Sequence, residues 1–314
     1  MTAFNEVKWK DVAISSSAAY GVCILKIGII GKGTPCATII AGVHGDEGPW
    51  GALVIKYLLD SIELDDIIGS LKIVPVANPL AMESDSRVSP LDNLDLNRIF
   101  PGDPNGSHTH RLAAAIVEHS LTGADYVYDL HGGGSWCVNA FGFSFTGSED
   151  MVSSINPPFI VDTPEKQGTL TGYSKKMGSK VTAIEMGGRC SQENEWAERI
   201  ANGLKTSLID LGVICGEKPQ RMDPPARKVG PTTVLRTDEG GIFIPDIKED
   251  VVGTVIKMGT ILGKLVNPET MDDLQEFVAP FEKTAVLLLR PHISVVEGGA
   301  MIYVVAPIKE EVDT

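Results

Sequence analysis

The first two thirds of this chain alternate between short β-branched runs and segments with helical apolar spacing. Two glycine-bounded runs, 22–30 and 37–43, predict strands, and 53–62 shows the i, i+3, i+4 apolar spacing of a helix. Strands that alternate with helices imply a mostly parallel or mixed sheet flanked by helices, which is an α/β fold. The same alternation predicts further strands at 71–76, 126–130 and 181–184, and helices at 108–121, capped by Ser107, and at 193–211.

The pattern changes near residue 222, where the prolines of 222–225 indicate a linker. From there glycines separate short β-branched runs such as 285–289, and only 271–277 has helical spacing. A length of 314 residues suggests about two domains. We therefore expect an α/β domain over 1–222 and a smaller all-β domain over 223–314.

Charge and composition narrow the kind of partner. Asp and Glu outnumber Lys and Arg by 41 to 27, which gives a formal net charge of −14. Nucleic acids and anionic membranes both select basic surfaces, so this acidic balance argues against either partner. A small-molecule substrate is the simpler expectation.

Targeting signals and cysteines predict the compartment. No stretch approaches 18 consecutive apolar residues, and charged residues interrupt 1–15, where a signal peptide would be apolar. Five cysteines are scattered along the chain without a C-x-x-C pair, a pattern typical of a reducing compartment. We expect a cytoplasmic protein whose cysteines are small residues in or near the core.

Two histidines follow predicted strands directly and are candidate metal ligands. His44 ends the strand at 37–43, and Glu47 follows it in a glycine-rich turn. His131 ends the strand at 126–130 and is followed by three glycines. Since ligands gather at the carboxyl ends of strands in open α/β sheets, the three side chains can converge. Two histidines and one carboxylate form a ligand set of catalytic zinc.

Other interpretations of these residues stay open. His44 at a strand end with a solvated Glu47 is also compatible with an ordinary surface position, and His131 with a hydrogen-bonded core histidine. Asp129, two residues before His131, is either a carboxylate that orients a ligand or a cap for neighbouring amides.

A third strand end supplies a candidate proton carrier. Glu185 follows the apolar run 181–184 and precedes two glycines. A carboxylate there can take a proton from a metal-activated water and pass it to a departing amine. The alternative is a strand-end glutamate in solvent.

The segment 87–102 contains arginines beside hydrophobic residues. The guanidinium of Arg87 or Arg98 suits a carboxylate and can also stabilise a developing oxyanion. Ordinary ion pairing with Asp92 or Asp95 is the alternative.

Together these segments make the chain resemble the succinylglutamate desuccinylase/aspartoacylase family, zinc-dependent amidohydrolases related in fold to zinc carboxypeptidases. The resemblance rests on four motifs in order: G-V-H-G-D-E at 42–47, D-L-N-R-x-F-P-G at 95–102, D-L-H-G at 129–132 and E-x-G-G at 185–188. It spans most of residues 20–310. It implies a zinc-carboxypeptidase-like α/β domain and a C-terminal β domain of barrel-sandwich character.

The resemblance also implies roles for individual residues. His44, Glu47 and His131 become the ligands of one Zn²⁺ per chain, and Glu185 becomes the general base and acid. Arg87 would polarise the scissile carbonyl. Two further residues, Asn97 and Arg98, would hold a substrate carboxylate, with Arg189 as a further candidate contact.

The implied reaction is hydrolysis of the amide bond of a small N-acyl amino acid, and the family often self-associates. A zinc carboxypeptidase acting on short peptides and a non-catalytic ligand-binding homologue are the alternatives. The acyl group and the amino acid stay open.

Overall fold

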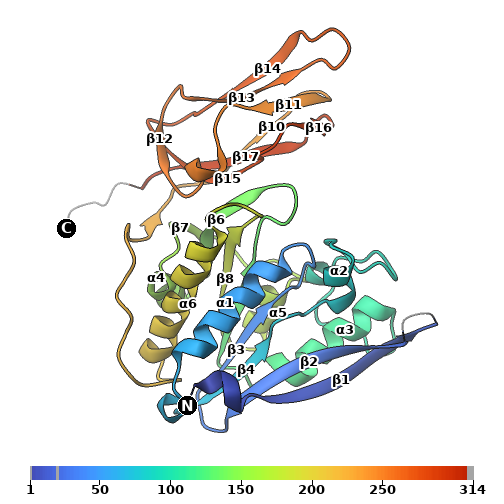
Figure 1. Ribbon diagram of the computed structural model, residues 1–314, viewed down its shortest axis with the longest axis vertical. Coiled ribbons are helices and arrows are strands. Elements are labelled where there is room, and N and C mark those ends of the chain that lie inside the picture. The colour runs from blue at the N-terminus through green and yellow to red at the C-terminus, as the bar shows by residue number, and fades with distance from the viewer. Residues whose placement is uncertain (1, 19–20, 310–314) are drawn as a thin grey trace.

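The computed structural model describes residues 2–18 and 21–309. Over those residues the chain forms an α/β fold with a mixed parallel and antiparallel sheet of thirteen strands. A second sheet of four strands lies above it (Figure 1). The main path of the large sheet runs β1-β2-β4-β3-β5-β8-β6-β15-β17-β10. Its strands before residue 222 are β1 (Lys8–Ser17), β2 (Gly21–Gly31), β3 (Cys36–Ala41), β4 (Ser70–Val74), β5 (Tyr126–His131), β6 (Val138–Ser144), β7 (Phe159–Asp162) and β8 (Lys180–Gly187).

Strand directions confirm the expected α/β fold and show that its sheet is mixed. β3 lies between β4 and β5 and is parallel to both, and β5 is parallel to β8. β2 is antiparallel to β4, and β6 is antiparallel to β8. The carboxyl ends of β3, β5 and β8 therefore meet at one edge of the sheet.

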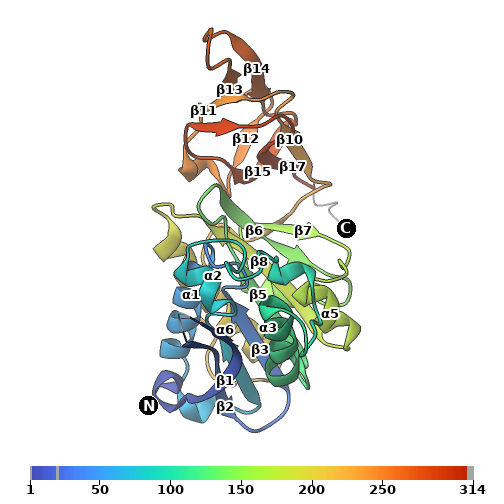
Figure 2. The same ribbon diagram turned by 90° about the vertical axis from the view of Figure 1, so that its right-hand side faces the viewer.

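Helices cover both faces of the sheet. α1 (Gly48–Ser61), α4 (Glu149–Ile155) and α6 (Glu193–Asp210) share one hydrophobic core, in which α1 and α6 lie side by side (Figure 1). α3 (His108–Ile116) and α5 (Leu170–Lys176) pack on the other face (Figure 2). The short α2 (Pro79–Glu83) follows β4, and a π-helical turn at Val117–Leu121 continues α3. No helix of the described residues is long and apolar enough to cross a membrane.

Strands after residue 222 lie above the helices (Figure 1) and also extend the large sheet. β15 pairs with β6 through Leu288 opposite Asn139 and Leu289 opposite Val138. The second sheet, in the order β14-β13-β11-β16, packs onto these strands through Tyr303, whose ring lies edge to face with Phe243 and 6.3 Å from the ring of Phe277. The strands are β9 (Arg227–Lys228), β10 (Thr233–Arg236), β11 (Gly241–Pro245), β12 (Val255–Lys257), β13 (Ile261–Val266), β14 (Asp273–Val278), β15 (Lys283–Leu289), β16 (Ser294–Val296) and β17 (Met301–Pro307).

The helix expected at 271–277 is wrong, because this segment forms β14. The helix-favouring Leu274, Gln275 and Glu276 adopt an extended backbone since β13 pairs along them and Phe277 packs on Phe243. Tertiary pairing overrides the local preference of these residues.

Two helix starts also differ from expectation. α1 begins at Gly48 and takes Pro49 into its first turn, where the missing N–H of proline costs no hydrogen bond. Ser107 precedes α3, but its hydroxyl donates to Asp92. The Asp92 carboxylate instead accepts the backbone N–H of Thr109 at 2.9 Å and so caps the helix.

The cysteines are all free, as expected, and four of the five are buried. Cys215 is exposed, so the prediction that all lie in or near the core is wrong for this residue.

Candidate metal centre and active site

Tight turns after two parallel strands bring the candidate ligands together. His44 and Glu47 lie in the turn between β3 and α1, and His131 is the last residue of β5. The turn needs glycine at position 45, because a Cβ atom there would lie 2.0 Å from the backbone carbon of Ala81. The chain therefore reverses closely enough for Glu47 to face both histidines.

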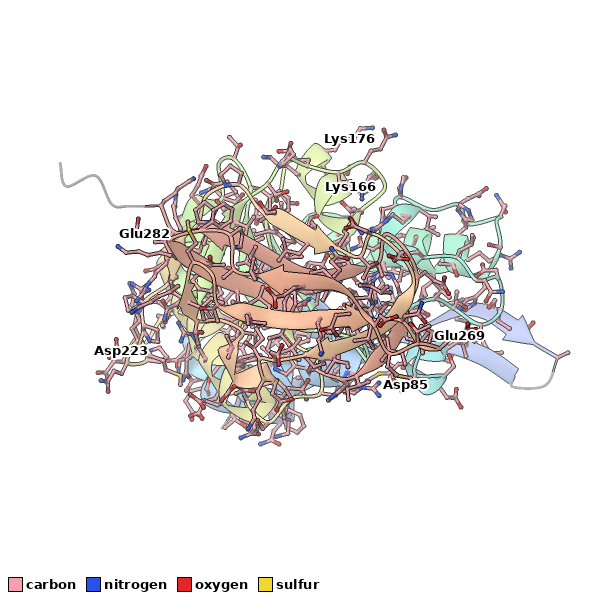
Figure 3. The ribbon with its side chains drawn as sticks, turned by 90° about the horizontal axis from the view of Figure 1, so that it is seen from above. Asp85, Lys166, Lys176, Asp223, Glu269 and Glu282 are labelled. Atoms are coloured by element: carbon pink, nitrogen blue, oxygen red, sulfur yellow. The ribbon has the colours of Figure 1, made fainter. Side chains whose placement is uncertain are left out.

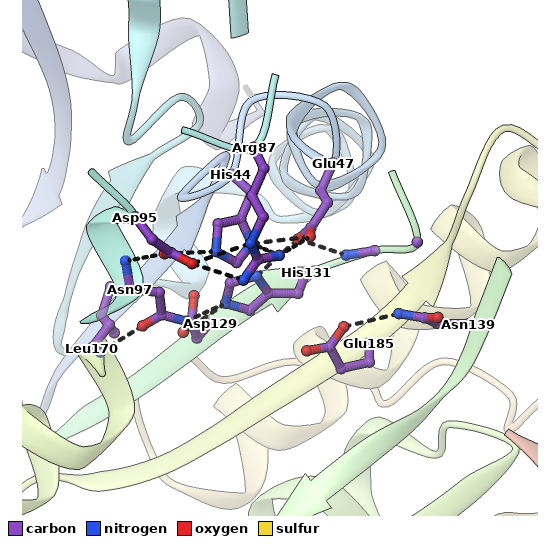
Figure 4. A network of polar contacts seen from close by, with 12 residues as sticks. His44, Glu47, Arg87, Asp95, Asn97, Asp129, His131, Asn139, Leu170 and Glu185 are labelled. Carbon is purple, nitrogen blue, oxygen red and sulfur yellow. Dashed lines mark hydrogen bonds and ion pairs between the residues drawn. The ribbon is translucent and has the colours of Figure 1, made fainter. Parts of the chain in front are cut away.

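Glu47 forms the centre of the cluster. Its Oε1 lies 2.9 Å from Nδ1 of His44, and its Oε2 lies 2.9 Å from Nδ1 of His131 (Figure 4). One ligand atom from each of the three residues falls within 4.8 Å of the others, and both histidines are buried. The cluster could therefore hold a metal ion.

Each histidine also faces a second carboxylate through its other ring nitrogen. Nε2 of His44 lies 3.2 Å from Asp95 Oδ1, and Nε2 of His131 lies 3.0 Å from Asp129 Oδ2. Burial alone would lower the pKa of each imidazole, but the neighbouring carboxylates raise both pKa values. Two imidazoles held between carboxylates form a site that favours a cation, and this donor set fits zinc.

The same contacts lower the pKa values of the carboxyl groups of Glu47 and Asp95. Burial opposes ionisation of Glu47, yet hydrogen bonds from His131 and His44 hold its pKa well below the usual range. The pKa of Asp95 is also well below its usual range, because the contact with His44 and the charge of Arg87 outweigh burial. Both side chains therefore stay anionic, as metal ligation and ligand orientation require.

Glu185 lies near the end of β8, next to the His44–Glu47–His131 cluster, but it is not one of the three clustered residues. In the sheet register it stands opposite His131 on β5 and Phe141 on β6. The amide of Asn139 donates to its Oε2 at 3.0 Å (Figure 4). Burial raises the pKa of Glu185 to about 7, so this carboxyl can take up or release a proton near neutral pH.

Arg87 contacts both the cluster and one of its supporting carboxylates. Its Nε and Nη2 donate to Asp95 Oδ2 at 3.1 and 3.0 Å, so the ion pair considered from the sequence is present. Its Nη1 lies 3.3 Å from Nδ1 of His44 and 3.4 Å from Glu47 Oε1. The guanidinium therefore points at the atoms that form the candidate metal site (Figure 4).

Asn97 and Arg98 line the same cavity as the cluster. Asn97 Nδ2 lies 3.3 Å from His131 Nε2, and its Oδ1 accepts the backbone N–H of Leu170 at 2.8 Å. Arg98 is exposed and donates to the carbonyl oxygen of Asn97 at 2.7 Å.

Arg189 lies elsewhere. It pairs with Asp85 and is not among the residues that line the cavity. Seen from above, Asp85 and the cavity-lining Lys166 lie on opposite sides of the C-terminal strands (Figure 3). The structure therefore does not bring Arg189 to the site.

The cavity has a volume of about 870 Å³ and contains more than the residues found from sequence. Asp95 supports His44, Asn139 supports Glu185, and the aromatic rings of Phe141, Phe143 and Phe145 line one side. Asp95 was considered only as an ion-pair partner of arginine. The alternation F-x-F-x-F at 141–145 was a signal for a strand with one aromatic face.

Residues 34–209, more than half of the chain, match the family model described as the succinylglutamate desuccinylase/aspartoacylase catalytic domain. The chain belongs to this family. This assignment confirms the resemblance found from the four motifs, and it identifies the chain as a relative of amidohydrolases.

Relatives that match nearly the whole chain support the same family assignment. The chain is 24% identical to N-alpha-acetyl-L-2,4-diaminobutyric acid deacetylase of Halomonas elongata, over 94% of this chain and 89% of the relative. A product-bound ectoine utilization protein of Ruegeria pomeroyi has a TM-score of 0.81 and 23% identity, and a succinylglutamate desuccinylase of Silicibacter has a TM-score of 0.80 and 23% identity. Each of the two structures matches 96% of this chain and 95% of its own. The fold of the family therefore extends through the C-terminal strands.

Proposed function

We propose that this protein is a zinc-dependent hydrolase that cleaves the amide bond of a small N-acyl amino acid. One observation carries the proposal: a buried His44–Glu47–His131 cluster and the proton-carrying Glu185 line one cavity. The names of relatives such as the diaminobutyric acid deacetylase support this reaction class.

His44, Glu47 and His131 would hold one zinc ion per chain. When bound, zinc supplies a Lewis acid that polarises the amide carbonyl and lowers the pKa of water. Asp95 and Asp129 fix the ring orientation of the two histidines through the nitrogens that face away from Glu47.

Glu185 carries the proton. It accepts one proton from the attacking water as the new carbon–oxygen bond forms. It then donates that proton to the amide nitrogen as the carbon–nitrogen bond breaks, which leaves a carboxylic acid and a free amine. The acid then loses its proton to the amine, which gives a carboxylate and an ammonium group. Its pKa of about 7 suits both directions of transfer, and the amide of Asn139 holds its orientation.

Two arginines and an asparagine near the cluster bind the remaining charges of the substrate. Arg87 points toward the cluster and stabilises negative charge on the carbonyl oxygen. Asn97 and Arg98 hold the carboxylate of the amino acid, since both line the cavity and Arg98 is exposed to it.

We also propose that residues 223–314 form a smaller β domain of barrel-sandwich character that shapes the cavity. The described strands β15 and β17 contribute Leu287, Leu288, Met301 and Val304 to the lining. The domain therefore acts on substrate access and selectivity, while the chemistry belongs to residues 1–222.

Amine release from N-acyl amino acids by the zinc-loaded protein tests the proposal. Dipeptides in the same assay test the carboxypeptidase alternative, and metal analysis tests the binding-module alternative. We expect one zinc per chain and turnover of an acyl amino acid, reduced roughly 10²–10⁴-fold in Glu185→Gln.

Three outcomes would overturn the proposal. Near-wild-type turnover in zinc-loaded Glu185→Gln would remove the role of Glu185. Preferential cleavage of dipeptides would favour a carboxypeptidase. Absence of stoichiometric zinc would favour a binding module.

A further inference from the structure

We infer that the substrate carries a bulky hydrophobic group, which an apolar wall beside Glu185 binds. This inference rests on the proposed function and specifies its substrate class. The apolar wall consists of six side chains from β6, the residue after it, β7, β15 and β17 that line the cavity: Phe141, Phe143, Phe145, Val161, Leu287 and Val304.

The wall begins at the catalytic groups. Alternate residues of β6 point to the same face of the sheet, so Phe141 and Phe143 share the face of Asn139, whose amide contacts Glu185. Phe141 stands opposite Glu185 in the register, and Glu185 stands opposite His131. An acyl amide held at the cluster therefore lies next to the first aromatic ring.

A second row continues away from the cluster. Phe143 stands between Ala183 on β8 and Val161 on β7, and Ala183 stands opposite Asp129 on β5. All four of these residues line the cavity. The small side chain of Ala183 leaves room above the sheet next to the ring of Phe143, which is only partly buried.

The rings themselves form a continuous surface. Phe141 and Phe143 meet edge to face with centroids 5.1 Å apart, and Phe143 and Phe145 lie 6.4 Å apart. Leu287 of β15 is buried in the same hydrophobic cluster as Phe141 and Val161, and the partly buried Val304 of β17 adds aliphatic surface. Such a surface binds an alkyl chain or an aromatic ring.

The described cations that line the cavity and lack an ion pair lie outside the apolar wall. Of the lining cations, Arg87 pairs with Asp95, and Lys309 pairs with Asp162 at 2.9 Å. Among the described residues, Arg98 and Lys166 are the lining cations with no ion pair to a carboxylate.

Neither unpaired cation belongs to the apolar wall. A succinyl or aspartyl carboxylate placed against Phe143 would lose its hydration without gaining a partner, which is unfavourable. A hydrophobic group in the same place gains roughly fourfold in affinity for each methylene buried. The cavity volume of about 870 Å³ also exceeds what an acetyl group needs.

The hydrophobic group can belong to the acyl part or to the amino acid side chain, and two substrate series distinguish these sources. The acyl series is N-acetyl-, N-hexanoyl-, N-benzoyl- and N-succinylglycine. The side-chain series is N-acetyl-leucine, N-acetyl-phenylalanine and N-acetyl-aspartate. We expect kcat/KM for a hydrophobic member of one series to exceed those of N-acetylglycine and of the acidic member by at least about tenfold.

A matched pair of variants at the centre of the wall tests the assignment to this surface. Phe143→Arg places a cation there and should reverse the preference toward the acidic member of the series. Phe143→Leu keeps the surface apolar and should retain the wild-type order. Equal thermal unfolding midpoints of the two variants check that the arginine variant is folded.

Binding of the uncleaved substrates to Glu185→Gln, measured by calorimetry, separates the two proposals. Hydrophobic members that bind most tightly while the wild type hydrolyses none of them would support the apolar wall and overturn the proposed function. Efficient hydrolysis led by acetyl or acidic substrates would support the proposed function and overturn the apolar wall. An unchanged preference in folded Phe143→Arg would also overturn the apolar wall.

Discussion

Neighbouring strands of one sheet supply two adjacent parts of the cavity lining, one polar and one apolar. β3, β5 and β8 end in, or lead directly to, His44, His131 and Glu185, each followed closely by glycine. β6 lies next to β8 and presents Phe141 and Phe143 to the same space. In the proposed function, the parallel strand ends thus carry the groups that react, and the antiparallel strand carries the groups that select. Chemistry and selectivity can therefore vary independently within this fold.

The largest effect on activity should come from removing one of the three candidate metal ligands. Glu47→Gln removes the carboxylate that bridges the two histidines, so we expect loss of stoichiometric zinc and roughly 10³-fold or more of kcat. Metal analysis and steady-state kinetics measure both effects. Glu118→Gln, at a glutamate whose side chain is 75% exposed, is the control and should keep zinc and activity. Retained zinc in Glu47→Gln would contradict the ligand assignment.

A smaller loss should follow when a supporting carboxylate is neutralised. Asp95→Asn weakens the hold on Nε2 of His44, and we expect zinc affinity to fall roughly 10–100-fold. Competition with a chelator of known affinity measures it, and the exposed Asp65→Asn serves as the control. Unchanged affinity would mean that Asp95 does not support the metal site and serves only to hold Arg87 and the backbone N–H of Asn97.

Asn139 links the two sides, because it lies on β6 and contacts Glu185 of β8. Its amide stabilises the charged form of that carboxyl, so Asn139→Leu should raise the pKa of Glu185 above its value of about 7. Since the base must be deprotonated, wild-type kcat/KM should fall toward acidic pH below about pH 7. In the variant this acidic limb should move to higher pH with zinc content unchanged. A drop in rate at all pH values without a moved limb would show a merely structural role.

The smallest expected effect is on stability, and it concerns the loop that carries Arg87 and Asn97. Asp92 accepts hydrogen bonds from Ser107 and from Thr109 at the start of α3, and its pKa is lowered because these bonds outweigh burial. A lowered carboxyl pKa stabilises the folded state above the unfolded value of about 4, and this contribution is lost as pH falls below it.

Asp92→Ala should therefore cost about 1–2 kcal/mol of unfolding free energy at pH 7. The difference from wild type should shrink below pH 4. Denaturant unfolding at both pH values measures it, and a pH-independent difference would contradict the role of the charged form.

Much of the fold and of the reactive side could be predicted from the sequence, for a physical reason. Buried parallel strands appear as apolar runs, and a polar residue followed by glycine at the end of such a run is conspicuous. His44, His131 and Glu185 all stand in that position. β5 and β8 were expected within a few residues of their bounds.

The selecting side was not predicted, because its residues look like ordinary core. Phe141 is buried, and Phe143 differs from a buried phenylalanine only through the space left beside Ala183, which depends on the register of β6 with β8. Asn139 depends on the same register. The helix wrongly expected at 271–277 has a similar cause, since pairing with β13 decides its conformation.

The outer edge of β6 is shared by two strands, with β15 along its first residues and β7 along its last. The pairing with β15 involves only Leu288 and Leu289, yet it closes an edge that would otherwise be open to other chains. Deleting the residues after 222 would therefore expose the unpaired edge of β6, and it would also open the cavity that the C-terminal strands help to line. A chain shortened in this way keeps His44, Glu47, His131 and Glu185, and we expect it to aggregate before any broadened selectivity can be measured.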